Sequence, residues 1–155
     1  GFKSLQSHRV ASWLWKNSRH TLAHYFQSRT SEVYGVDIHP AAKLGKGIMI
    51  DHGTGVVIGE TSVIKDNVSI FQGVTLGGTG KETGDRHPKV MEGVLLSASS
   101  TVLGNVQIGR NAKIAAGSVV LEDVKEGTTV AGVPAKEVSQ AVDNVPADDI
   151  DHLIE

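Results

Sequence analysis

The sequence contains no cysteine, few aromatic residues and no apolar run long enough to cross a membrane. The missing thiols exclude disulfide bonds and a cysteine nucleophile. Aromatic residues make up 5% of the 155 residues, and the formal net charge of −2 favours neither a nucleic-acid nor a membrane partner. A spanning helix needs about 20 apolar residues in succession, and no signal peptide is visible. We therefore expect a cytoplasmic protein with one main domain.

A six-residue period runs through most of the chain. Aliphatic residues recur every six positions, with one slip of two residues after Ile50, and small or β-branched residues follow at a four-residue offset. This period is typical of a hexapeptide β-solenoid, in which each hexad forms a short strand and a turn. We expect the aliphatic side chains to point inward and to stack one coil apart, as Val102 on Val120. The aliphatic series is Ile38, Leu44, Ile50, Ile58, Ile64, Ile70, Leu76, Val90, Leu96, Val102, Ile108, Ile114 and Val120.

The period divides the chain into three parts. Residues 36–138 form the expected solenoid, which a polar, glycine-rich excursion interrupts at residues 77–89. Residues 1–35 instead have apolar residues at helical spacing, and residues 139–155 are acidic and lose the period, which predicts a loosely held tail. The predicted fold is mainly β: a parallel β-helix of hexapeptide repeats with a short N-terminal helical segment.

The N-terminal segment predicts two helices, separated at Asn17-Ser18. We expect them, with both tryptophans, to cap the open end of the solenoid or to pack on a neighbouring subunit. The apolar positions of the first helix are Phe2, Leu5, Val10, Trp13 and Leu14.

Polar residues interrupt the repeat first at Asp51-His52, in the turn after the inward Ile50. Asp37 precedes His52 by fifteen residues, less than one coil of about eighteen, so the two are expected on adjacent rungs about 4.8 Å apart along the axis. A carboxylate that holds one imidazole nitrogen leaves the other nitrogen free to take a proton. Asp37 and His52 are therefore candidates for a general-base pair. The alternative is that both are exposed at unrelated corners.

The excursion is the second polar region. Arg86-His87-Pro88 offers a planar guanidinium, which suits a carboxylate ligand, beside an imidazole. The run Gly77-Gly78-Thr79-Gly80 offers backbone N–H groups to a chain-like ligand or an oxyanion, although a plain flexible loop explains it equally well.

These motifs follow in a specific order: DIHP, DH, LGGTGK and GDRHPK, then AAGSVVL and AGVPAK. In this order they resemble the serine O-acetyltransferases, enzymes of cysteine biosynthesis within the left-handed β-helix acyltransferases. The resemblance runs from about Gly1 to Val138 and implies a left-handed coil. The chain begins on Gly1, inside the last part of the family's N-terminal helical domain, so we expect a shortened form of a longer protein.

The resemblance also implies site residues. His52 would be the general base that removes the proton of the serine hydroxyl as it attacks acetyl-CoA, by direct transfer, and Asp37 would orient it. Acetyl-CoA would lie in a groove between two solenoids. The residues implied to hold serine are Asp51, Arg86 and His87, and those implied to contact acetyl-CoA are Gly78, Ala98, Ala116 and Lys113.

Partners follow from the same resemblance. Members of the family are inhibited by L-cysteine, form homotrimers that pair into hexamers, and dock a C-terminal tail ending on isoleucine into O-acetylserine sulfhydrylase. Here Glu155 follows Ile154, and an acidic residue that the family places near the serine amino group is missing with the N-terminal part. Either the tail continues beyond Glu155, or its docking is altered or absent. Without the missing N-terminal part we expect hexamer formation and serine affinity to be affected.

Other functions remain open. Another CoA-dependent hexapeptide acetyltransferase, acting on a sugar or amino sugar, would keep the groove and the histidine base but would need a different acceptor pocket. A metal hydrolyase of the carbonic anhydrase kind would need convergence of three histidines, of which only His39, His52 and His87 lie in or beside the coils. We expect no metal. A scaffold without activity is the third class.

Overall fold

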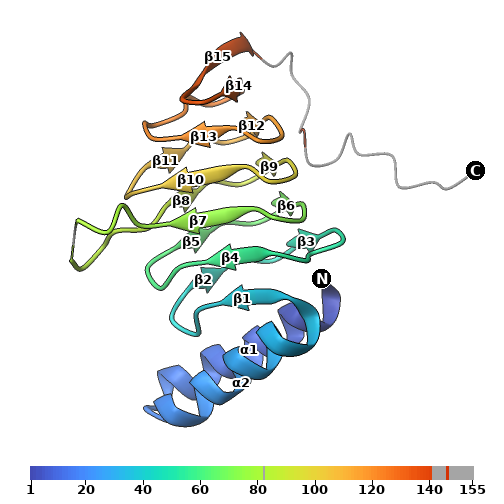
Figure 1. Cartoon of the computed structure of the whole chain (residues 1–155), viewed down its shortest axis with the longest axis vertical. Coiled ribbons are helices and arrows are strands. Elements are labelled where there is room, and N and C mark those ends of the chain that lie inside the picture. The colour runs from blue at the N-terminus through green and yellow to red at the C-terminus, as the bar shows by residue number, and fades with distance from the viewer. Residues whose placement is uncertain (82, 141–145, 147–155) are drawn as a thin grey trace, which may run out of the picture.

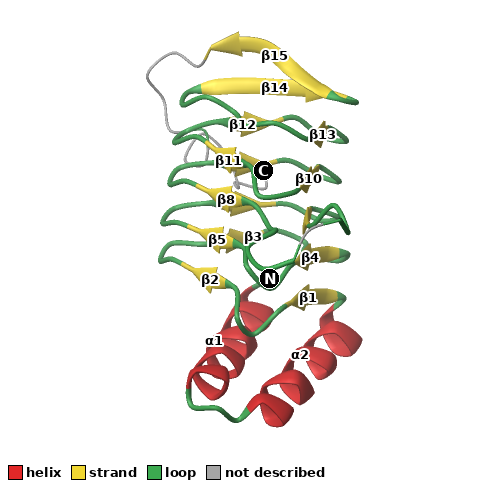
Figure 2. Cartoon of the chain, turned by 90° about the vertical axis from the view of Figure 1, so that its left-hand side faces the viewer, coloured by secondary structure: helices red, strands yellow, loops and turns green. Residues whose placement is uncertain are grey.

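The computed structural model describes residues 1–81, 83–140 and 146. Two helices, α1 (Phe2–Lys16) and α2 (His20–Tyr34), form a hairpin at one end of a tall, three-sided stack of short strands (Figures 1 and 2). The helix break at residues 17–19 is where the sequence predicts it. Helix α2 ends at Gly35, whose φ of 64° is the left-handed conformation that glycine adopts readily.

The strands form three parallel faces, which we call A, B and C. Face A stacks β1, β4, β7, β10 and β13; face B stacks β2, β5, β8 and β11; face C stacks β3, β6, β9, β12 and β14, with β15 at its end. The strands are β1 (Val36–Ile38), β2 (Lys43–Leu44), β3 (Met49–Ile50), β4 (Val56–Ile58), β5 (Val63–Ile64), β6 (Ser69–Ile70), β7 (Thr75–Gly77), β8 (Lys89–Val90), β9 (Leu95–Leu96), β10 (Thr101–Leu103), β11 (Gln107–Ile108), β12 (Lys113–Ile114), β13 (Val119–Val120), β14 (Thr128–Gly132) and β15 (Ala135–Gln140).

Strand register confirms the six-residue period. Val102 lies beside Val120 in the parallel pair of β10 and β13, as expected. The slip of two residues lengthens the first coil, because Ile38 lies beside Ile58, whereas Ile58 lies beside Leu76. Every aliphatic residue of the series is buried except Leu44, which packs partly buried against the same core. These apolar stacks are the main source of the solenoid's stability.

Helix α1 closes the lower end of the solenoid. Leu5, His8, Ala11 and Leu14 are buried, and the Arg9 guanidinium donates hydrogen bonds to the carbonyl oxygens of Leu44 (2.7 Å) and Gly45. Phe2 and Trp13 are 74% and 60% exposed, so part of the expected apolar stripe faces away from the coil. The packed face includes buried Ser4 and His8, which apolar periodicity does not mark.

A hairpin closes the upper end. Strand β14 pairs parallel with β12, adding a further rung to face C, and β15 returns antiparallel to β14. The acidic tail expected at residues 139–155, including Ile154 and Glu155, lies almost entirely outside the described residues. Within residues 1–81, 83–140 and 146, no helix has the length and apolar character to cross a membrane.

Candidate functional site

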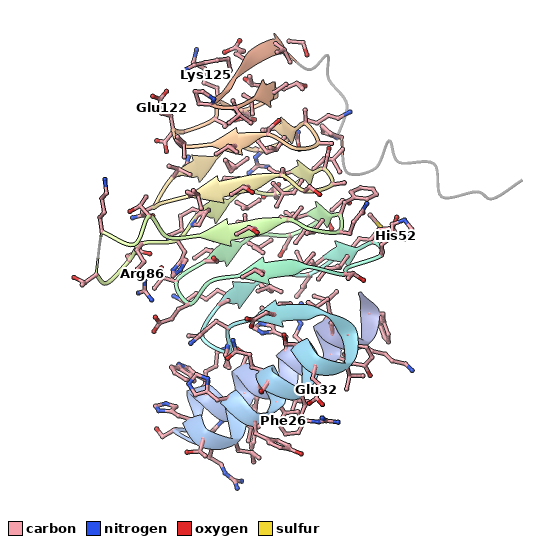
Figure 3. The ribbon with its side chains drawn as sticks, viewed as in Figure 1. Phe26, Glu32, His52, Arg86, Glu122 and Lys125 are labelled. Carbon is pink, nitrogen blue, oxygen red and sulfur yellow. The ribbon has the colours of Figure 1, made fainter. Side chains whose placement is uncertain are left out.

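The candidate residues lie at two different edges of face A. Asp51 and His52 occupy the turn between β3 and β4, at the edge shared by faces C and A. Arg86 and His87 occupy the loop between β7 and β8, at the edge shared by faces A and B. Figure 3 shows His52 and Arg86 on opposite sides of the solenoid. A single chain therefore does not bring the predicted base and the predicted carboxylate-binding arginine together.

His52 projects from a strained turn. Its φ of 55° is left-handed, a conformation that non-glycine residues adopt at a cost of roughly 1–3 kcal/mol. Its backbone N–H donates to Asp51 Oδ1 (2.9 Å), and its Nε2 lies 3.7 Å from Asp51 Oδ2. The His52 side chain is 70% exposed. Its imidazole is thus open to a group outside the chain.

Asp37 does not contact His52 within the chain. Its Oδ1 accepts a hydrogen bond from Gln27 Nε2 of helix α2 (2.7 Å), and in the sheet it lies beside Val57. Among the described residues no hydrogen bond or ion pair joins Asp37 to His52. The reason is the register: Asp37 lies mid-strand beside Val57, five residues beyond His52, and two of those five residues are the slip in the turn after β3.

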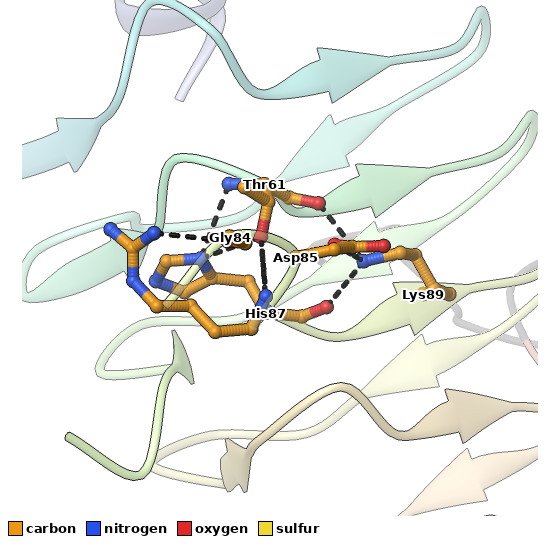
Figure 4. Close-up of polar contacts among 6 residues, drawn as sticks. Thr61, Gly84, Asp85, His87 and Lys89 are labelled. Carbon is orange, nitrogen blue, oxygen red and sulfur yellow. Dashed lines mark hydrogen bonds and ion pairs between the residues drawn. The ribbon is translucent and has the colours of Figure 1, made fainter. Parts of the chain in front are cut away.

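Thr61 anchors the loop that carries Arg86 and His87 (Figure 4). Thr61 Oγ1 accepts hydrogen bonds from the backbone N–H groups of Arg86 and His87, both at 3.0 Å. Lys89 Nζ donates to the Thr61 carbonyl oxygen (3.0 Å), to the His87 carbonyl oxygen (2.6 Å) and to Asp85 Oδ1 (2.6 Å). These hydrogen bonds hold the C-terminal end of the loop against the turn after β4.

The Arg86 guanidinium is held by two acceptors. It donates to Glu60 Oε2 (2.8 Å) and to the Gly84 carbonyl oxygen (3.1 Å). The hydrogen bond from Arg86 lowers the pKa of Glu60, which keeps the carboxylate charged. Because the Arg86 side chain is 31% exposed, the guanidinium can still meet a carboxylate from outside.

The His87 ring fits a space that only glycine leaves. A Cβ at Gly59 would lie 2.0 Å from His87 Cδ2, so any larger residue there would displace the ring. His87 is 7% exposed, and its burial, followed by the nearby Arg86 charge, lowers its pKa. The imidazole is therefore neutral at physiological pH.

The predicted acetyl-CoA contacts are divided between the same two edges. Ala98 and Ala116 lie in successive turns on the edge that carries His52, and the Gly117 N–H donates to the Ala98 carbonyl oxygen (2.9 Å). Gly78 lies on the other edge, where a Cβ would come within 3.4 Å of Arg86 Cγ. Lys113 is exposed on β12 of face C.

Known proteins are similar to this chain in sequence. A family model described as "Bacterial transferase hexapeptide (six repeats)" matches residues 87–122. The curated serine acetyltransferase of Salmonella typhimurium strain LT2 is 56% identical over 151 residues, which make up 97% of this chain and 55% of the relative. The chain belongs to the serine acetyltransferase family. It spans about half the length of the curated relatives of that family that it matches.

Solved serine acetyltransferases share the fold. The enzyme from Brucella abortus strain S19, in complex with coenzyme A, matches with a TM-score of 0.91 and 56% identity over 92% of this chain and 57% of its own. A serine acetyltransferase in complex with cysteine matches with a TM-score of 0.95 and 56% identity over 100% of this chain and 60% of its own. As expected, the solenoid of this serine acetyltransferase family member is a left-handed parallel β-helix.

Sequence reasoning missed three residues of this family member's site: Gln27, Glu60 and Thr61. Each lies in a helix or turn where polar residues are ordinary, and the only signal for Thr61 is its position two residues after Gly59. His39 accepts a hydrogen bond from the Ala41 N–H at Nδ1 (3.1 Å), a contact within the turn after β1. In the described part of the chain, no three His, Cys, Asp or Glu side chains are grouped as a metal site requires.

Proposed function

We propose that the chain carries serine O-acetyltransferase activity, transferring acetyl from acetyl-CoA to the hydroxyl of L-serine to give O-acetylserine and CoA. The observation that carries this proposal is the 56% identity to a serine acetyltransferase over 97% of the chain, which includes both edges of face A. The coenzyme A and cysteine bound by the two related structures fit the same substrate class.

His52 acts as the general base in this reaction. Its exposed imidazole takes the hydroxyl proton while the serine oxygen attacks the thioester carbonyl carbon. The tetrahedral intermediate then breaks its carbon–sulfur bond, and the imidazolium returns the proton to the leaving thiolate. The acetyl group passes directly to serine, without an acetyl-enzyme. Asp51, Arg86 and His87 hold serine, with Arg86 on its carboxylate.

One active site is built from two chains. His52, Ala98 and Ala116 lie on one edge of face A, and Gly78, Arg86 and His87 lie on the other, so complementary edges of adjacent solenoids complete the acetyl-CoA groove. Asp37 lies on face A between these edges, and it orients the His52 of the adjacent chain across the groove.

The surface of face A supports such an assembly. Its outward row above Asp37 is uncharged and β-branched, as a subunit interface favours. The row consists of Val57, Thr75, Thr101 and Val119. The assembly is a homotrimer or a dimer of trimers, and Lys113 contributes a cation to the nucleotide end of acetyl-CoA.

The remaining assignments follow the same proposal. Residues 36–138, with the excursion at 77–89, form the catalytic β-helix; residues 1–35 end the helical domain; residues 139–155 form the tail.

L-cysteine occupies the serine pocket as a feedback inhibitor, because the two amino acids differ only at the γ atom. The tail contacts O-acetylserine sulfhydrylase, and the protein works in the cytoplasm.

A thiol-release assay tests the function. Free CoA is followed from acetyl-CoA with L-serine, and in parallel with sugars and amino sugars. We expect release that depends on L-serine and is suppressed by L-cysteine. Release with only a sugar or amino sugar would keep the fold and reject the acceptor, whereas CoA binding with no release would reject the activity of this chain.

A further inference from the structure

The hydrogen bonds around Thr61 determine which nitrogen of His87 carries a proton. Thr61 Oγ1 accepts from the backbone N–H groups of Arg86 and His87, both at 3.0 Å, which occupies its two lone pairs. Its single hydrogen faces His87 Nδ1, which lies 2.9 Å away, and also the Asp85 carboxylate, whose pKa is lowered first by its hydrogen bond from Lys89 and further by one from Thr61. The backbone N–H of Thr61 also points at His87 Nδ1, at 3.2 Å. Two donors therefore converge on Nδ1, which must be an acceptor.

A neutral imidazole carries one proton, so the proton of His87 is on Nε2. Burial lowers the pKa of His87, which keeps the ring neutral and the tautomer single. The same side of the ring lies over Gly59, where a Cβ would be 2.2 Å from Nε2. Within residues 1–81 and 83–140, no hydrogen bond uses Nε2.

We propose that Thr61 is a positioning residue that locks His87 as the Nε2–H tautomer, so that His87 donates a hydrogen bond to the bound serine and does not abstract its proton. This inference rests on the proposed function for the identity of the ligand, but the tautomer is a property of the free protein. It also separates the roles of two histidines: His52 is exposed and able to accept a proton, whereas His87 is buried and able only to donate.

The sharpest variant is Thr61→Val, which keeps the shape of the side chain and removes the hydroxyl. The matched variant Thr61→Ser keeps the hydroxyl and removes the methyl group. Ser62→Ala is the control for loss of a buried hydroxyl, because Ser62 Oγ has no hydrogen-bond partner in the described structure. Nitrogen-15 NMR of the imidazoles reads the tautomer, with the His87 signals identified by their loss in His87→Gln.

In the unaltered protein we expect the Nε2–H pattern for His87, with one protonated and one unprotonated nitrogen. In Thr61→Val only the backbone N–H still donates to Nδ1, so we expect the share of the Nε2–H tautomer to fall. We also expect a KM for L-serine raised roughly tenfold, as loss of a hydrogen-bonded anchor implies, with the KM for acetyl-CoA unchanged. Thr61→Ser and Ser62→Ala should keep the tautomer and both KM values.

Several results would overturn the proposal. An Nδ1–H pattern in the unaltered protein would do so whatever the activity. A tautomer unchanged in Thr61→Val would show that the Thr61 hydroxyl does not set it. A serine KM that changes equally in Ser62→Ala would show that the loss reflects packing. If Thr61→Val does not fold, NMR of the unaltered protein and of Thr61→Ser still shows whether His87 carries its proton on Nε2 or on Nδ1. If the protein does not acetylate serine, the tautomer is still read, so failure of the proposed function is seen separately.

Discussion

At the scale of the residue, the turn around His52 is built to expose an imidazole. Gly53 and Gly55 follow it with φ of 89° and 80°, so three of four residues in this turn are left-handed. A solenoid corner needs no such turn for its stability, since most corners here turn with fewer residues. Left-handed residues also occur at other corners, at Asn67, Ser99 and Asn111, so what sets the His52 turn apart is its two extra residues.

Replacing this base tests its role directly. His52→Ala should lower kcat by about 10²–10⁴-fold, the usual contribution of a general base, and leave acetyl-CoA affinity nearly unchanged. Asp37→Asn should cost less, because it removes the orienting charge and not the base. Thiol release measures kcat, and titration calorimetry measures affinity. His20→Ala, which removes a ring stacked on Trp15 in the helical segment, is the control. Equal loss of acetyl-CoA binding in His52→Ala would mean that His52 is structural.

The sequence predicts individual site residues only where they break a pattern. His52 and Arg86 stand out because they interrupt an aliphatic repeat or an excursion from it. Glu60 and Thr61 occupy an ordinary turn, and their roles arise from a loop that returns 25 or 26 residues later. The contact of Asp37 with Gln27 depends on how α2 lies against β1, which no local pattern specifies.

At the scale of the element, the six-residue period predicts every rung because each inward residue meets its equivalent one coil away. The helices are predicted less completely. Their bounds follow from the break at residues 17–19, but the packed face of α1 includes polar residues, and the apolar residues Phe2 and Trp13 are exposed. Apolar spacing predicts that a helix forms, whereas the shape of the solenoid's end determines which side packs.

The contact between α1 and the lowest coil should respond to pH through His8. Its side chain is 3% exposed, and burial, then the Arg9 charge, lowers its pKa from 6.5 to about 4. Between pH 6.5 and about pH 4, His8 binds a proton in the unfolded chain but not in the folded chain. The free energy of unfolding should therefore be highest above pH 6.5 and fall as the pH is lowered toward 4, by about 3 kcal/mol from this group.

Denaturant unfolding at about pH 7.5 and about pH 5 measures this dependence. His8→Leu should flatten it, because the buried position then has nothing to protonate. A smaller slope should remain, since the pKa values of His39 and His87 are also lowered. The same slope in both proteins would show that His8 does not control the docking of α1.

At the scale of the whole molecule, the fold places the proposed site residues on two separate edges of face A. A parallel β-helix presents its turns as straight edges, so residues in equivalent turns align along one edge, as Ala98 and Ala116 do. His52 shares that edge, and Arg86 is displaced to the next one by the full width of face A. Because the solenoid is straight, the residues on these two edges cannot meet within one chain. The period predicts this prism, but only the register of the turns shows that His52 and Arg86 lie on different edges.

Mixed assemblies test the split site. His52→Ala and Arg86→Ala chains should each be inactive alone, because every groove lacks either the base or the carboxylate-binding arginine. When the two chains are co-expressed with different tags and mixed assemblies are isolated through both tags, grooves that pair an intact His52 edge with an intact Arg86 edge form again. A cyclic trimer that contains both kinds of chain has one intact groove in three, so thiol release from the isolated mixed trimers should recover to about a third of the unaltered level.

A control separates complementation from reversion or exchange. Co-expression of two differently tagged His52→Ala chains should give no recovery, since no chain supplies the base. If both residues served the same groove from one chain, every groove in a mixed assembly would lack one of them, and activity would stay at the level of the single variants. Recovery therefore requires that base and arginine come from different chains, as we propose from the placement of His52 and Arg86 on opposite edges of face A.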